Sequence, residues 1–214
     1  MNSKAELQCR CGEVRGIVAD ASPRTANRAV CYCDDCQAFA HRLGRADLLN
    51  AQGGSDIIQV APASLAFVQG QDRIRGLRLT PKGLYRWYAS CCNTPVGNTL
   101  TPATPFVGIA ATTFDHGTQR AKDLFGAPRG GVFGKFAVGE KPAGAAAVVS
   151  LPLLLRTLGK ILAWRLRGKA WPHPFFKRDT GAPVYPVDVL TQKEREALRP
   201  LCGPRPPAAS SAPT

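Results

Sequence analysis

Short apolar segments separated by turn residues dominate the first 115 residues or so of the chain. Punctuation such as GG, QGQD, TPKG and TPATP recurs about every 8–12 residues, which is typical of an all-β domain. The segments predicted as strands read AELQC, EVRGIVA, RTANRAVC, DIIQVAP, SLAFVQG, RIRGLRLT, GLYRWYA, PVGNTL and PFVGIAA. Residues 5–115 are therefore predicted to form a mainly β domain.

One helix is expected inside this region, over the segment DDCQAFAHRLG that follows Cys33. Asp34 or Cys33 is placed to cap its N-terminus, and Gly44 is placed to end it. The segment has room for about two or three helical turns.

The pattern changes beyond Gly117. Residues 126–147 are rich in Gly and Ala and are expected to form a loop, after which VVSLPLLLRTLGKILAWRLRGKAW predicts a helix of about five turns. Residues 191–199 predict a last short helix. We therefore divide the remainder into a loop and basic helical extension over 116–200 and a disordered tail over 201–214.

The long predicted helix has two interpretations. Its apolar residues lie on one stripe at 3–4 spacing: Leu151, Leu154, Leu155, Leu158, Ile161 and Leu162. We favour a surface helix that packs on the β domain. The alternative is a basic amphipathic helix that makes peripheral contact with an anionic membrane through residues 150–170. The uncharged run from Pro142 to Leu155 is too short to cross a bilayer.

The net charge of +13, from 28 basic and 15 acidic residues, favours anionic partners. These partners are nucleic acid, a membrane surface or a small acidic metabolite. Residues 156–178 contain basic but no acidic residues. Apart from Trp164 and Trp171, they lack the interleaved aromatic residues of a single-strand nucleic-acid platform, so nucleic acid is not the favoured partner.

The chain has eight cysteines, and its start, MNSKAELQCR, has no apolar run of the kind that an export signal carries. Cysteines in a reducing compartment are more often metal ligands or catalytic thiols than disulfides. A cytoplasmic location is therefore expected.

Seven of the cysteines form clusters, with Cys202 apart from them: Cys9 and Cys11; Cys31, Cys33 and Cys36; Cys91 and Cys92. Thiolates are soft ligands that suit Zn²⁺, which takes four of them tetrahedrally. Seven ligands divide naturally into four and three. We expect the adjacent triplet to form the three-ligand site, open to water or substrate, and the other two pairs to form a closed structural site. Two zinc ions per chain are expected.

A redox pair made of Cys33 and Cys36 is the main alternative, because a helix N-terminus lowers the pKa of a thiol. Thioredoxin-like motifs come with βαβ patterning, which is missing from this sequence, so we favour the metal site.

These motifs resemble one known family. Cys-x-Cys-Gly near the start, Cys-x-Cys-x-x-Cys some 20 residues on, and NTP with its cysteines after a Tyr/Trp-rich strand are similar to the glutathione-dependent formaldehyde-activating enzyme family, which shares its domain with centromere protein V. The resemblance covers residues 5–115. It implies an Mss4-like (β-tent) zinc domain, here with a helical C-terminal extension. In it Cys9 and Cys11 pair with the late cluster, while Cys31, Cys33 and Cys36 hold a catalytic zinc.

This chain departs from the family pattern at three places. The late motif reads ASCCNTP, so Ala89 stands where the family has its first cysteine, and Cys91 is the obvious substitute. The structural site is then either Cys9, Cys11, Cys91 and Cys92, or three of these with another ligand. Asn93 replaces a glycine, and Asn tolerates positive φ better than most residues. Tyr32 and Gln37 stand where the family often has His and Arg.

Two functions follow as hypotheses. The first is a zinc-dependent carbon–sulfur lyase that handles adducts of glutathione or another small thiol with formaldehyde or a similar aldehyde. Three thiolates damp the Lewis acidity of Zn²⁺ and favour presentation of a sulfur nucleophile. Arg10, Arg42 and Arg45 are candidates to attract a substrate carboxylate. The second is a non-catalytic, zinc-stabilised module whose basic surface binds nucleic acid or an anionic membrane.

Overall fold

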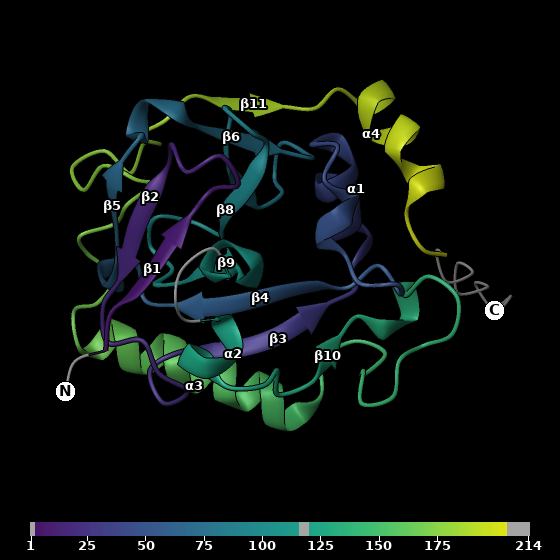
Figure 1. Ribbon diagram of the computed structural model, residues 1–214, viewed down its shortest axis with the longest axis horizontal. Coiled ribbons are helices and arrows are strands. Elements are labelled where there is room, and N and C mark those ends of the chain that lie inside the picture. The colour runs from purple at the N-terminus through teal and green to yellow at the C-terminus, as the bar shows by residue number, and fades with distance from the viewer. Residues whose placement is uncertain (1–2, 116–119, 205–214) are drawn as a thin grey trace, which may run out of the picture.

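The computed structural model describes residues 3–115 and 120–204 and shows a mixed α/β fold built on two strand-rich sheets (Figure 1). All nine strands expected between residues 5 and 115 are confirmed. Within the described residues the structure adds two short strands, β10 (Gly131–Val132) and β11 (Val187–Val189), to this set.

The smaller sheet has three antiparallel strands in the order β1-β2-β5. They are β1 (Ala5–Gln8), β2 (Arg15–Val18) and β5 (Leu65–Gln69). In β1 and β2 buried and more exposed residues alternate, as expected for strands with one face on the core.

The larger sheet has the order β10-β3-β4-β9-β8-β7-β6-β11. Its inner strands, all paired antiparallel, are β3 (Asn27–Cys31), β4 (Ser55–Val60), β9 (Val107–Ala110), β8 (Thr94–Thr99), β7 (Tyr85–Ala89) and β6 (Ile74–Arg78). The edge strands β10 and β11 pair in parallel with β3 and β6. Both edge strands belong to the segment beyond residue 117. They pair with backbone groups of β3 and β6 that would otherwise be exposed at the edges of the sheet.

In the described part of the chain, four α-helices lie around the sheets: α1 (Asp34–Arg42), α2 (Ala121–Phe125), α3 (Leu151–Leu166) and α4 (Gln192–Leu198). Short 3₁₀ turns occupy Ala46–Leu48, Pro62–Ser64, Gln71–Arg73, Ala111–Phe114, Gly134–Phe136 and Arg199–Leu201. The predicted helices after Cys33, around residue 158 and over 191–199 are all confirmed. Gly44 has the positive φ of a helix terminator, and Thr191 and Glu194 form a capping box at the start of α4.

The main core joins the large sheet to the segment beyond residue 117. Trp87 of β7 is fully buried, and the ring of Phe175 stacks on it at a centroid separation of 4.7 Å. Gly97 of β8 makes room for this contact, because a Cβ there would lie 2.9 Å from the Phe175 ring. Phe176 packs edge-on to the same tryptophan. Late aromatic residues thus complete a core that the early strands begin.

The same segment also holds α1 in place. The buried Gln37 side chain donates from Nε2 to the carbonyls of Tyr32 and Phe136, and its Oε1 accepts from the backbone N–H of Gly203. Of the predicted disordered tail, 201–204 are described and carry this contact, and 205–214 lie outside the described residues. The predicted boundary between a domain over residues 5–115 and an extension over 116–200 stays a prediction.

Helix α3 packs on the β domain, but the leucine stripe that we expected to face this domain lies mostly on its outer side. Leu153 and Trp164 are the buried residues of the helix. Of the predicted stripe, Ile161 is half-buried, whereas Leu151, Leu154, Leu155, Leu158 and Leu162 are exposed. The inner face is mixed: beside Leu153 and Trp164 it carries polar contacts, in which Asn27 of β3 donates to the Thr157 hydroxyl and Arg156 donates to the Asn27 amide oxygen.

We expect Phe175→Ala to lower the free energy of unfolding by about 3–5 kcal/mol, because it removes a ring that the fold cannot refill. Leu201→Ala, at a residue 51% exposed, is the matched control and should cost about 0.5 kcal/mol or less. Chemical denaturation of both variants measures the difference. Equal losses would contradict the assigned core.

His173 gives the fold a pH dependence. Its Nδ1 accepts from the Phe175 N–H, and burial lowers the pKa of His173 to about 4. Between about pH 4 and the ordinary pKa of about 6.5, His173 is protonated in the unfolded chain but neutral in the folded one. The free energy of unfolding therefore falls as the pH falls through this range. At pH 5 the loss should be about 2 kcal/mol. His173→Asn keeps the acceptor but does not titrate, so its unfolding midpoint should fall less between pH 7 and pH 5 than that of the wild type.

Candidate metal centres

Cys9, Cys11, Cys91 and Cys92 lie together, at two turns that come from different sheets. Cys9 and Cys11 occupy the connection from β1 to β2, where Gly12 has a φ of +81° and the Cys9 sulfur accepts from the Val14 N–H at 3.2 Å. Cys91 and Cys92 occupy the turn between β7 and β8. Asn93 has the positive φ that the missing glycine demanded. The group therefore joins the small sheet to the large one.

The spacing of the four sulfurs fits a tetrahedral thiolate site. A zinc–sulfur bond of about 2.3 Å places tetrahedral ligands about 3.8 Å apart. The Sγ–Sγ distances are 3.5 Å from Cys9 to Cys11, 3.8 Å from Cys9 to Cys91 and 3.9 Å from Cys91 to Cys92. All four sulfurs lie within 4.8 Å of one another, so Cys91 occupies the position that the absent cysteine at Ala89 left open.

The surroundings of these thiols shift their pKa values in different directions. Burial, together with contacts to the neighbouring sulfurs, raises the pKa values of Cys9 and Cys91. Burial also opposes ionisation of Cys92, yet hydrogen bonds with Thr94 and Cys11 bring its pKa down to about 6. A bound cation would replace the protons that remain on the other sulfurs.

Two of the arginines proposed to bind a substrate carboxylate belong to this centre. The backbone N–H of Arg10 donates to the Thr94 hydroxyl oxygen, and Arg45 donates to the same oxygen at 3.1 Å. The buried Arg45 guanidinium also pairs with Asp47. The third candidate, Arg42, is exposed and lies 3.9 Å from a carboxylate oxygen of Glu194. Arg42 and Arg45 therefore face carboxylates of the protein, whereas the contact of Arg10 is made by its backbone alone.

The second group, Cys31, Cys33 and Cys36, lies where β3 passes into α1. Cys31 ends the strand, Cys33 is the N-cap residue of the helix, and Cys36 lies in its first turn. The Cys33 carbonyl accepts from the N–H of Cys36, which closes this turn. The three sulfurs lie within 4.8 Å of one another, and each residue is partly exposed. The partial positive charge of the helix N-terminus favours anionic ligands here.

A buried arginine that the sequence analysis missed lies beside these cysteines. Arg86 of β7 is 1% exposed, and its Nη1 donates to the Cys36 sulfur at 3.7 Å. Its Nη2 lies 3.6 Å from Asp35, which also pairs with Arg195. The thiols of Cys31 and Cys33 and the Arg86 guanidinium hold the pKa of Cys36 well below its ordinary value, against the effect of burial. The Arg86 guanidinium thus favours the thiolate form of Cys36.

A small cavity of about 20 Å³ lies between Cys36 and Arg86. Three buried polar atoms of its lining residues have no hydrogen-bond partner within the described part of the chain: Arg86 Nη2, Asn98 Oδ1 and Thr112 Oγ1. Space of this size holds about one water or a comparably small polar molecule. The residues around this space, Cys36 among them, therefore include polar groups that could still accept or donate a hydrogen bond.

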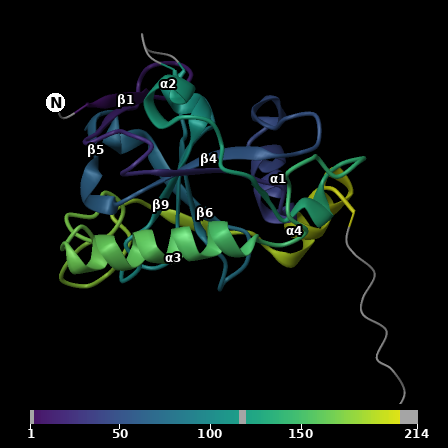
Figure 2. The same ribbon diagram turned by 90° about the horizontal axis from the view of Figure 1, so that it is seen from below.

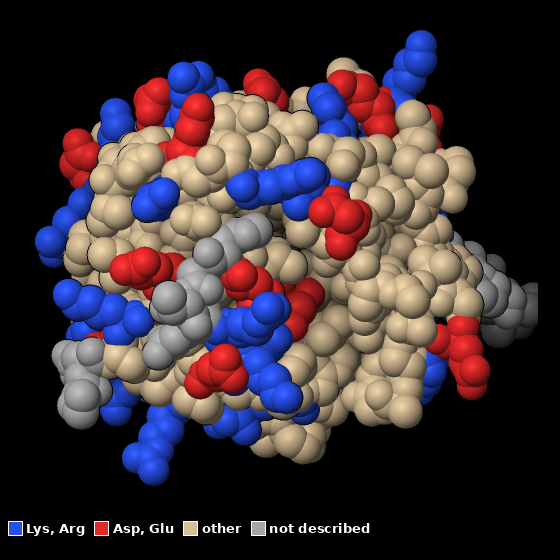
Figure 3. Space-filling model, viewed as in Figure 1, with Lys and Arg blue, Asp and Glu red and all other residues tan. Residues whose placement is uncertain are grey.

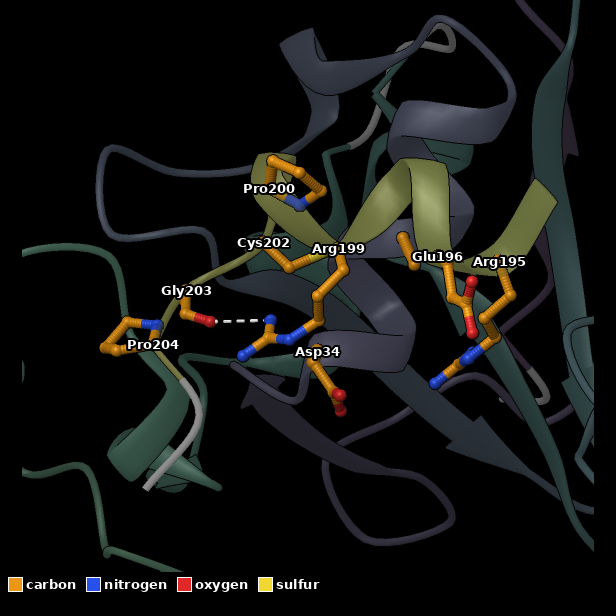
Figure 4. A pocket seen from close by; sticks show the side chains of 9 residues that line it. Asp34, Arg195, Glu196, Arg199, Pro200, Cys202, Gly203 and Pro204 are labelled. Atoms are coloured by element: carbon orange, nitrogen blue, oxygen red, sulfur yellow. Dashed lines mark hydrogen bonds between the residues drawn. The ribbon is translucent and has the colours of Figure 1, made fainter. Parts of the chain in front are cut away.

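A roomier cavity lies elsewhere, between α1 and residues 195–204. Its volume is about 580 Å³, and Asp34, Arg195, Glu196, Arg199 and Cys202 are among its lining residues (Figure 4). Arg199 donates across it to the Gly203 carbonyl. Its lining includes none of the three clustered cysteines, whereas that of the small cavity includes Cys36. The small cavity is therefore the one that bears on chemistry at this group.

Tyr32 and Gln37 have structural contacts that explain their identity. The Tyr32 hydroxyl accepts from Asn50, and its ring packs with Val30, Ala137 and Ala145. Gln37 ties α1 to residues 136 and 203, as described above. Both residues thus anchor the late part of the chain. A signal for Arg86 was present in the sequence, because a lone arginine within the aromatic strand GLYRWYA is unusual in a core strand.

The comparisons with known proteins identify the family. A model for a family of unknown function, DUF6151, matches residues 1–188. The chain belongs to this family. The DUF6151 match includes both cysteine groups and α3, and it ends at β11, before α4 begins.

No curated protein matches this DUF6151 member. A crystal structure of a Rhodobacter sphaeroides protein, solved as a structural genomics target, is similar at 17% identity with a TM-score of 0.39. The match covers 57% of this chain and 97% of that chain.

Metal analysis of the purified protein should find about two zinc ions per chain, since each cysteine group can hold one. Cys33→Ser should retain about one ion and stay folded. Cys91→Ser should also retain about one but melt more than about 10 °C lower, because its site joins the two sheets. Cys202→Ser, outside both groups, is the control and should keep both ions. A folded wild type that contains no metal would contradict both sites.

Proposed function

We propose that this protein is a zinc-dependent enzyme of the carbon–sulfur lyase type that forms and cleaves adducts between a small thiol and a small aldehyde. The observation that carries the proposal is the division of seven cysteines into a group of four and a group of three. Four thiolates complete a tetrahedral zinc site, whereas three leave one position for a substrate.

The chemistry of three thiolates suits a sulfur substrate. Zinc bound by Cys31, Cys33 and Cys36 would lower the pKa of a substrate thiol and hold it as a thiolate. In the forward reaction the sulfur lone pair attacks the aldehyde carbon and a carbon–sulfur bond forms. The carbonyl π bond breaks, and its electron pair goes to oxygen, which takes up a proton equivalent to the one that the thiol released. The reverse steps regenerate thiol and aldehyde, so no oxidant or reductant is needed.

Arg86 supplies the group that this reaction needs at the aldehyde oxygen. Arg86 is among the residues that line the small cavity, and its Nη2, 3.6 Å from Asp35, makes no hydrogen bond within residues 3–115 and 120–204. A buried guanidinium that donates to the oxygen becomes more favourable as negative charge develops there. The cavity volume of about 20 Å³ limits the aldehyde to very few non-hydrogen atoms, formaldehyde being the smallest.

The resemblance to the glutathione-dependent formaldehyde-activating enzyme family supports the same reaction and an Mss4-like domain. The basic residue expected beside the catalytic cysteines of that family is replaced here by Gln37, which has a structural role. Arg86 comes from another strand and restores a positive charge next to Cys36. We propose glutathione or another small thiol as the first substrate to test.

The test is two-dimensional exchange NMR on mixtures of formaldehyde with glutathione or other small thiols, with and without zinc-loaded protein. The wild type should speed the interconversion of free thiol and adduct. Cys33→Ser should abolish the acceleration, and Cys202→Ser should leave it unchanged. Arg86→Met should lower the rate about 10²-fold, with partial recovery in Arg86→Lys, because one charged donor to the oxyanion is lost.

Zinc content and circular dichroism of each variant separate loss of chemistry from loss of the site. The same thiols should protect Cys31, Cys33 and Cys36 from alkylation in the wild type. If a zinc-loaded, folded protein accelerates no thiol–aldehyde pair and no thiol protects the cysteines, the enzyme proposal fails. A non-catalytic zinc-stabilised module is then the better description.

A further inference from the structure

Helix α3 presents a row of leucines to solvent. Leu151, Leu155, Leu158 and Leu162 are 52–64% exposed, and Leu166 is 78% exposed. These positions recur at three- and four-residue spacing, so they share one face of the helix. The helix runs along the lower edge of the molecule in Figure 1 and across the near side in Figure 2. Its leucine face is therefore a continuous apolar ridge on the outside of the protein.

The helix is held on the protein by its opposite side, where Leu153 and Trp164 are buried next to polar contacts, and this leaves the ridge free. Arg156 donates to the Asn27 side chain and to the Pro23 carbonyl, and Lys160 donates to the Arg24 carbonyl. An ordinary surface helix has the opposite arrangement, with its apolar face on the core. A large exposed apolar surface of this kind marks a site of interaction.

Basic residues gather on the flank of α3 away from the ridge and on the loops next to it, without acidic partners. Arg24, Arg129, Arg156, Lys160, Arg167 and Lys169 form no ion pair with a carboxylate in the part of the chain that the structure describes. Burial and the charges of Arg156, Arg129 and Arg167 lower the pKa of Lys160, which shows that these cations lie close together. Lys and Arg side chains line the lower edge of the molecule in Figure 3, where α3 runs.

A cavity of about 260 Å³ opens at the C-terminal half of α3. Its lining includes four cations, Arg24, Lys160, Arg167 and Lys169, and one carboxylate, Asp20. The cavity therefore offers a predominantly positive recess at one end of the apolar ridge. An anionic group with an attached apolar chain would satisfy both features.

We propose that α3 is a membrane-docking helix, which inserts its leucine ridge into the interface of a bilayer that contains anionic phospholipid. The exposed Arg165 and Arg167 at the C-terminal end of the helix, together with Arg24 and Lys169 of the cavity, bind the lipid phosphates. Apolar burial and attraction to anionic headgroups together are what holds an interfacial helix on a membrane. Each juxtamembrane Lys or Arg contributes about 1 kcal/mol to this attraction.

The charge of the surface favours this occupant over the others. A second copy of the chain would place one cluster of unpaired cations near another, and a purely polar polyanion would leave the leucines in water. A bilayer covers both features at once. None of the helices in the described ranges is long and apolar enough to cross a membrane, so the contact is peripheral.

The experiment is flotation of the full-length, zinc-loaded protein with phosphatidylcholine vesicles that contain or lack phosphatidylglycerol. The wild type should float with the phosphatidylglycerol vesicles and less with phosphatidylcholine alone, and added salt should weaken binding. The double variant Leu155→Gln with Leu158→Gln should lower the partition coefficient by about tenfold or more, because two inserted side chains are lost. Both positions are exposed and helical, so the fold should tolerate the change.

Matched variants elsewhere on the surface separate this face from general stickiness. Val189→Gln removes an exposed apolar residue of β11, which lies along the opposite edge of the molecule in Figure 1, and should float as the wild type does. Arg167→Gln and Lys169→Gln should each weaken binding about fivefold and reduce its salt dependence. Lys193→Gln on α4 removes the same charge at a distance and should have a smaller effect.

Three outcomes would overturn the proposal. The first is no flotation with phosphatidylglycerol vesicles even at low salt. The second is binding that falls with the charge variants but not with the leucine variant, which would indicate a polar polyanion such as nucleic acid. The third is a dimer in solution that the leucine variant converts to a monomer, with no vesicle binding. Because none of these measurements involves thiol or aldehyde, they leave the proposed enzymatic activity to be judged separately.

Discussion

The convergence of seven cysteine sulfurs into two tight groups is the constraint on which the rest of the structure depends. Thiolates a few ångströms apart repel one another, so without a cation most of them keep their protons. The raised pKa values of Cys9, Cys31 and Cys91 follow from contact with neighbouring sulfurs and from burial. Only a multivalent cation removes this repulsion and satisfies the sulfurs together. Folding and metal binding are therefore expected to be linked, most strongly where the metal joins two sheets.

The segment beyond residue 117 completes the early strands. It supplies both edge strands of the large sheet, the Phe175 ring on Trp87 and the backbone groups that Gln37 ties to α1. These contacts explain why Gln37 and Tyr32, beside the three cysteines, are structural here. Positive charge comes to Cys36 from β7 instead, through Arg86. A positive charge next to Cys36 can thus come from β7, while the positions of Tyr32 and Gln37 serve packing.

The features of the fold and of the cysteine sites that could be predicted are those encoded by residues close together in the sequence. Strand segments, the helix after Cys33 and the split of the cysteines rest on spacing along the chain, and the structure contains all of them. Asn93 was expected to adopt a positive φ from its residue type, and it does. Arg86 was missed because its approach to Cys36 depends on how β7 lies against α1, which no local pattern reports. Edge strands as short as β10 and β11 carry too few residues for a periodic signal.

The orientation of α3 shows the limit of periodicity most clearly. A hydrophobic stripe tells which residues share a face, but not whether that face meets the core or another apolar phase. The deciding residues were polar. Asn27 of β3 is buried and bonds both Thr157 and Arg156, so the sheet surface beneath the helix requires hydrogen-bonding partners. A leucine face placed there would leave the Asn27 amide oxygen without its Arg156 donor and the amide NH₂ with Gln59 alone, at a cost of about 1–3 kcal/mol. The buried Asn27 amide thus favours polar residues on the inner face of α3. Most of the leucines of the helix accordingly lie on its outer face.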